Sequence, residues 1–470
     1  MATGAELGYN INATALQMAN AIFGNGVTVV GASYQGDSRS SAIYSDGDAL
    51  APGVTPSDTG VILSTGLASS FTQSSGDPNR ATGTSTNTSG IDNDSQFNAL
   101  AGTQTYDASI LNVDFIPTGN VMTMQFVFSS EEYPEYASSQ FNDMVGVWIN
   151  GTHVPLSVGN GDPSVGNINT GSNLYVDNTG DAYNTEMDGF TLTMTLTIPV
   201  NPGVVNSIRI GVADVADSQY DSNLLIAGDS TQTELVAIAD SESIYVDHSK
   251  TLDVLANDQN GTAGSLTITH INGVAVTAGQ TVILPSGDSI TLNADGTLTV
   301  LADTDADTFH FTYDVESTTG ATDTGMVTIA TIPCFVAGTL IATSKGQIPV
   351  EDLTPGDLVL THDDGPQPLR WIGRRVVPAD GTFAPVRIEA GTFGNHDTLL
   401  VSPQHRVLIR HMQAELLFGE AEVLVAAKDL VNRNSVQIVT GGTVEYVHLL
   451  FDRHQVIYSA GLPSESYLPG

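Results

Sequence analysis

The stretch CFVAGTLIATSKGQIPVEDLTPGDLVLTHDDGPQPLRWIGRR, residues 334–375, decides the fold of the C-terminal part of the chain. Its short apolar runs alternate with turns rich in Gly, Pro and Asp, which is typical of short strands joined by tight turns. The alternation continues to the end of the chain, so residues 331–470 are predicted to form one β domain. A partly helical stretch is expected over 414–429. Strands are expected at 339–343, 357–363, 369–377, 384–390, 405–410, 435–439 and 446–451.

The residues before this segment predict two further β domains, so the whole chain is expected to be all-β and multidomain. Alternating apolar runs and loops rich in Ser, Gly, Asn and Asp indicate a large β-sandwich-like domain over 1–228. A short helix is expected near 13–23. The spacing of the apolar runs changes near residue 230. The short runs over 229–330 have the spacing of a smaller sandwich.

Charge separates the last segment from the rest of the chain. Residues 1–330 hold four of the 14 Lys and Arg residues, and residues 331–470 hold the other ten. Six of the ten histidines also lie in the last segment. Such a shift in composition marks a change of domain.

The formal net charge of −38 excludes nucleic acid as an expected partner, because a polyanion would be repelled. Two interpretations of so much acid remain open: solubility, and the binding of divalent cations such as calcium through oxygen ligands. The single cysteine excludes an internal disulfide framework. No apolar run approaches the roughly 18 residues of a membrane span, and the N-terminal residues lack a standard signal peptide.

Three blocks carry a resemblance to a known family. The stretch 334–375, the sequence VSPQHRVLIRH at 401–411 and the ending at 446–470 resemble, in order and spacing, a bacterial Hint (Hedgehog/intein-type) domain. The resemblance implies an autocatalytic step that needs no cofactor. The thiol of Cys334 would attack the carbonyl carbon of Pro333, giving a thioester and freeing the amine of the cysteine.

The same resemblance assigns roles to further residues. His405 matches the family histidine that supplies a proton to the departing nitrogen, and Ser402 stands where the family usually has threonine. His448 lies where many inteins carry aspartate, and His454 matches the histidine of the penultimate block. Asp452 and His454 are expected on one face of a strand, with Asp452 as base or orienter. Thr339 stands five residues after the cysteine.

The ending GLPSESYLPG departs from splicing inteins, which end in His-Asn followed by a nucleophile. Splicing is therefore not expected. The remaining outcome resembles that of Hedgehog proteins, in which water, an amine or another nucleophile resolves the thioester. Nothing in the sequence implies cholesterol as the acceptor.

The N-terminal part carries its own resemblance. GVILSTGLASS at 60–70, FVFSSEEYPEYASSQFNDMVGVWING at 126–151 and ADVADSQYDSNLLI at 213–226 resemble a bacterial choice-of-anchor L domain over 28–228. TLDVLANDQNG at 251–261 and FHFTYDV at 309–315 are similar to a cadherin-like or Ig-like spacer. Closely spaced turn carboxylates are either solvated or calcium ligands. The ligand candidates are Glu131, Glu132, Asp143, Asp214, Asp217 and Asp221, with Asn257 and Asp258 in the spacer.

These expectations combine into an extracellular or surface protein whose Hint-like segment cleaves the Pro333–Cys334 bond. Export would use a route that does not read a standard N-terminal signal. The expected partners are a cell-surface or matrix component, or a nucleophile that accepts the thioester. Two alternatives stay open: a non-catalytic, calcium-stabilised adhesin with a degenerate Hint domain, and a thiol hydrolase that acts on other molecules.

Overall fold

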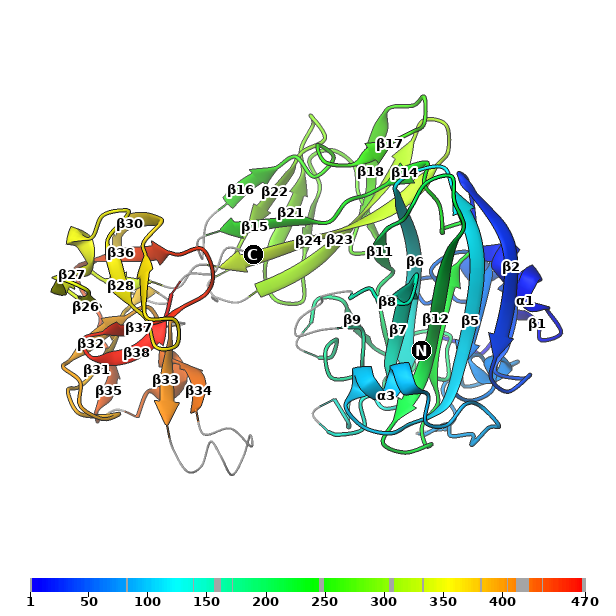
Figure 1. The fold of residues 1–470 in the computed structure, drawn as a ribbon, viewed down its shortest axis with the longest axis horizontal. Coiled ribbons are helices and arrows are strands. Elements are labelled where there is room, and N and C mark those ends of the chain that lie inside the picture. The colour runs from blue at the N-terminus through cyan, green and yellow to red at the C-terminus, as the bar shows by residue number, and fades with distance from the viewer. Residues whose placement is uncertain are drawn as a thin grey trace. The chain divides into compact units, whose positions relative to one another are not determined.

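The computed structural model describes residues 2–470 except for 82, 138, 156–161, 171, 245–248, 304–307, 332–333, 381–382, 404, 411–421, 433 and 467–470. The described part is mostly strand with few helices, which confirms the all-β class (Figure 1). The chain forms two compact units. Residues 1–240, 251–300 and 309–328 make the first, and residues 241–250, 301–308 and 329–470 make the second. None of the described helices is long and apolar enough to cross a membrane.

The N-terminal part is a two-sheet sandwich. The larger sheet has the order β1 (Gly8–Asn10), β3 (Ser41–Ser45), β4 (Gly60–Ser64), β13 (Ser222–Ala227), β6 (Val121–Ser130), β10 (Gly189–Thr191) and β9 (Tyr175–Asp177), with β11 (Met194–Pro199) also pairing with β6. The smaller sheet has the order β2 (Val27–Gln35), β5 (Thr105–Pro117), β12 (Asn206–Val215), β7 (Met144–Ile149) and β8 (Thr152–His153).

Alternate apolar side chains of the two sheets meet in one core. Leu111 and Phe115 of β5 pack in the same cluster as Phe126 and Phe128 of β6. Each such side chain contributes about 2 to 3 kcal/mol by leaving water. The predicted N-terminal helix is confirmed as α1 (Ala15–Ile22). A capping box supplies hydrogen-bond partners to free N–H groups at its N-terminus, and its buried face packs in the core.

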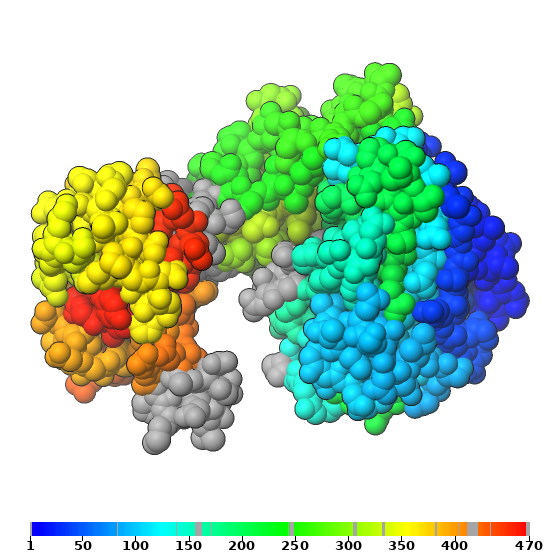
Figure 2. Space-filling view, in the orientation of Figure 1, coloured from blue at the N-terminus to red at the C-terminus, as the bar shows by residue number. Residues whose placement is uncertain are grey.

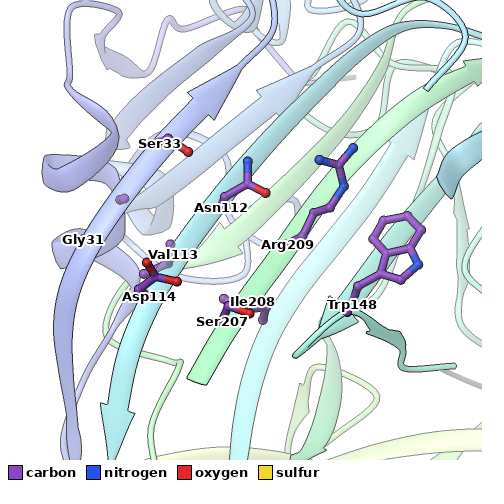
Figure 3. Close-up of a pocket in the computed structure, with 11 residues that line it drawn as sticks. Gly31, Ser33, Asn112, Val113, Asp114, Trp148, Ser207, Ile208 and Arg209 are labelled. Carbon is purple, nitrogen blue, oxygen red and sulfur yellow. The ribbon is translucent and has the colours of Figure 1, made fainter. Parts of the chain in front are cut away.

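Three shorter helical segments complete the sandwich: α2 (Gly47–Leu50), α3 (Ser95–Ala101) and the 3-10 turn η1 (Ala68–Ser70). Phe97 of α3 packs edge-on against Trp148 of β7, with ring centroids 5.1 Å apart. The face of the smaller sheet that carries Asn112 and Arg209 is hollowed by a cavity of about 420 Å³ (Figure 3). Gly31 of β2 contributes to the hollow, because nothing lies within 4 Å of the place where its Cβ would be.

The spacer consists of short strands. β24 (Thr322–Thr331), β23 (Thr308–Ser317), β18 (Leu266–Ile271) and β19 (Val274–Ala275) follow one another in one sheet, and β22 (Leu298–Leu301), β21 (Ser289–Leu292) and β20 (Thr281–Ile283) follow one another in a second. β14 (Leu235–Val236) pairs with β17 (Gln259–Asn260), and the remaining strands are β15 (Asp240–Ile244) and β16 (Ser249–Leu252).

The C-terminal segment folds into two further sheets. The first has the order β30 (Trp371–Pro378), β36 (Thr443–Leu450), β25 (Phe335–Val336), β32 (Leu399–Val401), β31 (Val386–Ile388) and β35 (Val436–Ile438). The second has the order β29 (Pro366–Pro368), β28 (Leu358–Leu360), β26 (Leu340–Thr343), β37 (Val456–Ser459), β38 (Leu462–Glu465), β33 (Arg406–Arg410) and β34 (Glu422–Ala426), with β27 (Gly346–Pro349) on β26. Two 3-10 turns, η2 (Val350–Asp352) and η4 (Ala427–Leu430), complete it.

The last strands of the chain lie inside this unit. β36 lies between β30 and β25, and β37 pairs with β26. Strands from the end of the chain therefore pair with strands from the beginning of this segment. Figure 2 shows the same interleaving, with red C-terminal atoms between yellow and orange ones. Each of the seven strands expected from the sequence overlaps a strand of the structure. The partly helical stretch expected over 414–429 is a strand, β34, over Glu422–Ala426, whereas its last three residues lie in the 3-10 turn η4; residues 414–421 lie outside the described residues.

Candidate active site

Strand register brings three distant parts of the chain together at Cys334. In the antiparallel pairing of β25, Phe335 lies opposite Val401 on one side and opposite Val447 on the other. Continuing each register by one residue puts Cys334 beside Ser402 and beside His448. Residues directly opposite each other in antiparallel strands extend their side chains to the same face.

Hydrogen bonds hold Cys334 in this position. The backbone N–H of Ser402 donates to the carbonyl oxygen of Cys334 at 3.0 Å. In return, the amide N–H of Cys334 donates to the Oγ of Ser402 at 3.1 Å. That amide nitrogen belongs to the Pro333–Cys334 bond, so Ser402 fixes the nitrogen that would become the leaving group. Pro333 itself lies outside the described residues.

His448 reaches the sulfur of Cys334. Its Nε2 lies 3.6 Å from Sγ, and only 1% of the residue is exposed. Burial raises the pKa of the Cys334 thiol to about 12, against the smaller opposing effects of the Ser402 hydroxyl and Arg375. The group is therefore a thiol at neutral pH and needs a base to become a nucleophile. The imidazole of His448 is positioned to accept that proton.

His405 lies on the other side of the same backbone. A turn brings it there, with its N–H donating to the carbonyl of Ser402 at 3.1 Å. Its ring packs edge-on against Phe335, with ring centroids 4.4 Å apart. The side chain is fully buried, and neither ring nitrogen has a hydrogen-bond partner among the described residues. An imidazole buried beside a nucleophile indicates a group available for proton transfer.

The environment of His405 makes its protonated form a stronger acid than an ordinary imidazolium. Burial lowers the pKa of the ring to about 4, while the charge of Glu465 and the neighbouring backbone of Cys334 oppose that shift. The ring is therefore neutral at pH 7. Its rare imidazolium form gives up its proton readily, which suits delivery to a departing amide nitrogen.

The other residues expected at the site, Asp452, His454 and Thr339, contact residues outside this cluster. Asp452 is an exposed partner of Arg370, with which it makes two hydrogen bonds of 2.8 and 2.6 Å. The expected strand around Asp452 is wrong, because β36 ends at Leu450 and residues 452–453 form a bend. His454 instead faces Glu465, at 3.7 Å between Nε2 and Oε2. The hydroxyl of Thr339 donates to the carbonyl of Val336 at 2.6 Å and so holds a turn.

Sequence reasoning missed Phe335 and Glu465. Phe335 forms the wall on which the His405 ring rests, and Glu465 accepts the N–H of Arg406 at 2.8 Å while acting on the pKa of His405. An aromatic residue next to the nucleophile was visible in the sequence. Glu465 carried no comparable signal, because it lies 60 residues along the chain and reaches the site only through β38.

The candidate calcium ligands of the N-terminal sandwich differ in how many hydrogen bonds their carboxylate oxygens accept. Both oxygens of Asp143 accept hydrogen bonds, from the Val215 N–H at 2.9 Å and the Ser222 hydroxyl at 2.7 Å. Asp217 accepts the Gln219 N–H at 3.0 Å. Among the described residues, no group of three or more His, Cys, Asp and Glu side chains is arranged around a common metal position.

The remaining candidate calcium ligands also differ in their hydrogen bonding. Glu132 accepts the N–H of Asp143 at 3.4 Å, whereas Asp214 Oδ1 and Asp221 Oδ2 are buried without a hydrogen-bond partner among the described residues. In the spacer, Asp258 accepts the N–H of Ile238 at 2.8 Å, and the Asn257 amide donates to the carbonyl of Ile238 at 3.2 Å. These two side chains therefore hold the local fold of the spacer.

Comparison with sequence families agrees with this geometry. Residues 333–470 match the family described as Hint domain. The C-terminal part of the chain is a Hint domain. Ahead of it, residues 9–232 match the choice-of-anchor L domain, and residues 232–330 match the bacterial Ig domain. The spacer is therefore of the Ig kind.

Several solved intein structures are similar to the Hint domain in fold. One is a splice-inactive variant of the AceL NrdHF class 3 split intein, with 16% identity, coverage of 29% of this chain and 97% of that chain, and a TM-score of 0.21. Another is a DnaB intein from Synechocystis sp. PCC 6803, with 9% identity, coverage of 29% and 99%, and a TM-score of 0.20. A comparison with curated proteins found no match.

The low pKa of His405 predicts a pH-dependent stability of the Hint domain. The folded pKa is about 4 against an ordinary 6.5, so the unfolded chain binds more protons between these values. The free energy of unfolding should therefore fall as the pH drops from about 6.5 to about 4, by about 3 kcal/mol for this group. The measurement is urea unfolding of the Cys334→Ala, Trp148→Phe chain, followed by the fluorescence of Trp371. A His405→Gln partner that shows the same pH slope would contradict the prediction.

Proposed function

We propose that the Hint domain catalyses an N-to-S acyl shift at the Pro333–Cys334 bond, which leads to cleavage or transfer of the preceding part without splicing. The observation that carries the proposal is the placement of two buried imidazoles, His448 and His405, around Cys334. One ring contacts the sulfur at 3.6 Å, and the other has no hydrogen-bond partner among the described residues.

The first step exchanges one bond and moves two protons, one from the sulfur to His448 and one from His405 to the nitrogen. His448 accepts the proton of the Cys334 thiol as the sulfur attacks the carbonyl carbon of Pro333. The carbon–nitrogen bond then breaks, and the nitrogen of Cys334 takes a proton from protonated His405. The products are a thioester at Pro333 and a free amine on Cys334. His448 then loses its proton to solvent and His405 regains one, so the net proton transfer is from sulfur to nitrogen and no cofactor is consumed.

Ser402 supports this step by fixing the reacting amide. Its Oγ accepts the N–H of Cys334, and its own N–H holds the carbonyl of the same residue. The reacting groups are thereby kept in one arrangement, and such positioning can lower the barrier of an intramolecular reaction by several kcal/mol. Burial also limits the access of bulk water to the sulfur, since Cys334 is 7% exposed.

The second step uses a nucleophile from outside the site. Water would release residues 1–333 as an acid, whereas an amine or thiol on another molecule would receive them by transfer. The choice-of-anchor L and bacterial Ig domains support a surface or secreted setting, in which the transferred part would be attached to a surface or matrix component.

Incubation of the purified full chain tests the proposal. We expect intact-mass measurement to find two products, residues 1–333 and residues 334–470, and we expect dithiothreitol to speed their appearance by attacking the thioester. A chain that keeps its full mass with and without the thiol would support the non-catalytic alternative. Turnover of added esters or peptides by an uncleaved chain would instead support the thiol hydrolase.

A further inference from the structure

The hollow on the smaller sheet of the N-terminal sandwich is lined by a row of side chains that crosses four strands. Strand register puts Ser33 of β2 opposite Asn112 of β5. It also puts Arg209 of β12 between Asn112 and Trp148 of β7. Directly opposed residues extend their side chains to the same face, so these four form one continuous row (Figure 3).

A second row lies two residues further along the same strands. Gly31 lies opposite Asp114, and Asp114 lies opposite Ser207. Nothing lies within 4 Å of the place where a Cβ of Gly31 would be, so this row is open at the β2 end. Ser33, Asp114 and Ser207 are exposed, and the hollow is therefore open to solvent.

The size of the hollow fits a small elongated ligand. Its volume of about 420 Å³ lies within the range of ligand pockets in proteins. Neighbouring strands in a sheet are about 4.8 Å apart, so a row across four strands is roughly 14 Å long. This shape favours a short chain of linked units over a single compact group.

The side chains of the two rows favour a ligand that carries many hydroxyl groups. The hydroxyls of Ser33 and Ser207 can donate and accept hydrogen bonds, and the carboxylate of Asp114 accepts them. An apolar ligand would take these groups from water and leave them without partners. The indole of Trp148, at the β7 end, adds an apolar surface for the C–H groups of such a ligand.

The charges around the hollow favour a neutral ligand. Nη2 of Arg209 donates to Oδ2 of Asp94 at 2.5 Å, and its Nη1 donates to Oε1 of Gln35 at 3.1 Å. The guanidinium charge is thus already balanced, and Asp114 adds a negative charge. An anionic ligand would also be repelled by the net charge of −38. A cationic ligand would have to lie beside the guanidinium of Arg209.

Two hydrogen-bond donors of the first row add to this pattern. Nδ2 of Asn112 and Nε of Arg209 are buried and have no hydrogen-bond partner among the described residues. Buried donors in folded proteins are nearly always paired, so these two indicate that acceptor oxygens from outside the chain complete the row. A ligand rich in hydroxyl groups supplies such oxygens.

We propose that this hollow binds a neutral oligosaccharide. Its hydroxyl oxygens would accept from Asn112 and Arg209, and its hydroxyl groups would donate to Asp114. The N-terminal domain would then recognise a glycan, whether or not the Hint domain cleaves the chain.

The test uses the full chain with Cys334→Ala, which removes cleavage, and Trp371→Phe, which leaves Trp148 as the only tryptophan. Cellohexaose, xylohexaose, mannohexaose, maltohexaose and chitohexaose are titrated separately to millimolar concentrations while the tryptophan emission is followed. We expect at least one of them to change the emission in a saturable way. Oligogalacturonate and oligolysine of the same length, which carry negative and positive charge, should leave the emission unchanged.

Two variants locate the bound oligosaccharide. Gly31→Leu should weaken binding about tenfold or more, because its side chain would occupy part of the hollow. Gly180→Leu, at a glycine of another loop that also has open space around its Cβ, is the matched control. Asp114→Asn should weaken binding about tenfold, because hydrogen bonds to charged groups are the stronger ones. Asp48→Asn, the same change at another exposed position, should bind as the parent does.

Three results would overturn the proposal. One is an emission that none of the neutral oligosaccharides changes. Another is a response to oligogalacturonate or oligolysine alone, which would indicate an ionic ligand. The third is saturable binding that Gly31→Leu and Asp114→Asn both leave unchanged, which would put the sugar elsewhere. A melting curve checks the fold of each variant, and Asp114→Asn, which adds no volume, decides the outcome if Gly31→Leu does not fold.

Discussion

Replacing Cys334 by alanine is expected to keep the purified chain at full length under conditions in which the parent cleaves. The substitution removes the only atom that can form the thioester, so the rate should fall by about four orders of magnitude or more. The side chain is small and lies in a minor apolar cluster with Val377, Ala379, Val444 and Tyr446, so alanine should leave the fold intact. Intact mass after timed incubation measures the rate, and a melting curve checks the fold.

The Cys334→Ser variant tests whether the sulfur atom itself is the nucleophile. The hydroxyl can still attack the same carbonyl carbon, but it is a weaker nucleophile than a thiol, so slow cleavage is expected. The resulting ester should respond little to dithiothreitol. Cleavage of Cys334→Ala at the rate of the parent would show that another residue or a contaminating protease cuts the chain.

Replacing His405 by glutamine should slow cleavage by about 10²- to 10⁴-fold, the range for loss of a general acid. Glutamine keeps a polar side chain of similar reach but cannot deliver a proton. The loss should be greatest at neutral pH and above, where solvent supplies few protons to the departing nitrogen. Initial rates from pH 5 to pH 9, measured by intact mass, test this expectation.

Asp452→Asn is the matched control for His405→Gln. Asp452 and His405 were both expected at the site from the sequence, yet Asp452 forms an exposed ion pair with Arg370. Such pairs contribute little to stability, so this variant should cleave within about twofold of the parent. Equal losses in the two variants would mean that the decrease reflects a disturbed fold and no specific proton transfer.

The Hint fold could be predicted from the sequence because its signals are local. Turn residues and apolar alternation in the stretch that begins at Cys334 predict strands that β26, β28 and β30 confirm. The helical expectation failed at β34 because an apolar run such as Glu422–Ala426 suits either structure. Its pairing with β33 decided the outcome, and that pairing cannot be read from the run itself.

The site could be predicted only in part. Cys334, Ser402 and His405 were expected together from the resemblance, and the register of β25 brings the first two into contact. The approach of His448 to the sulfur depends on the pairing of β25 with β36, over a separation of 114 residues. Asp452 was misplaced because the strand was assumed to continue beyond Leu450.

The central claim is a thioester at Pro333, and trapping with hydroxylamine tests it most directly. The full chain is incubated with hydroxylamine, and high-resolution mass spectrometry then reads the C-terminal peptide of the released fragment. The account predicts a fragment that ends at Pro333 as a hydroxamate, together with a partner that begins at Cys334 with a free amine. Cleavage at any other bond, or a parent chain that stays intact in hydroxylamine, would contradict it.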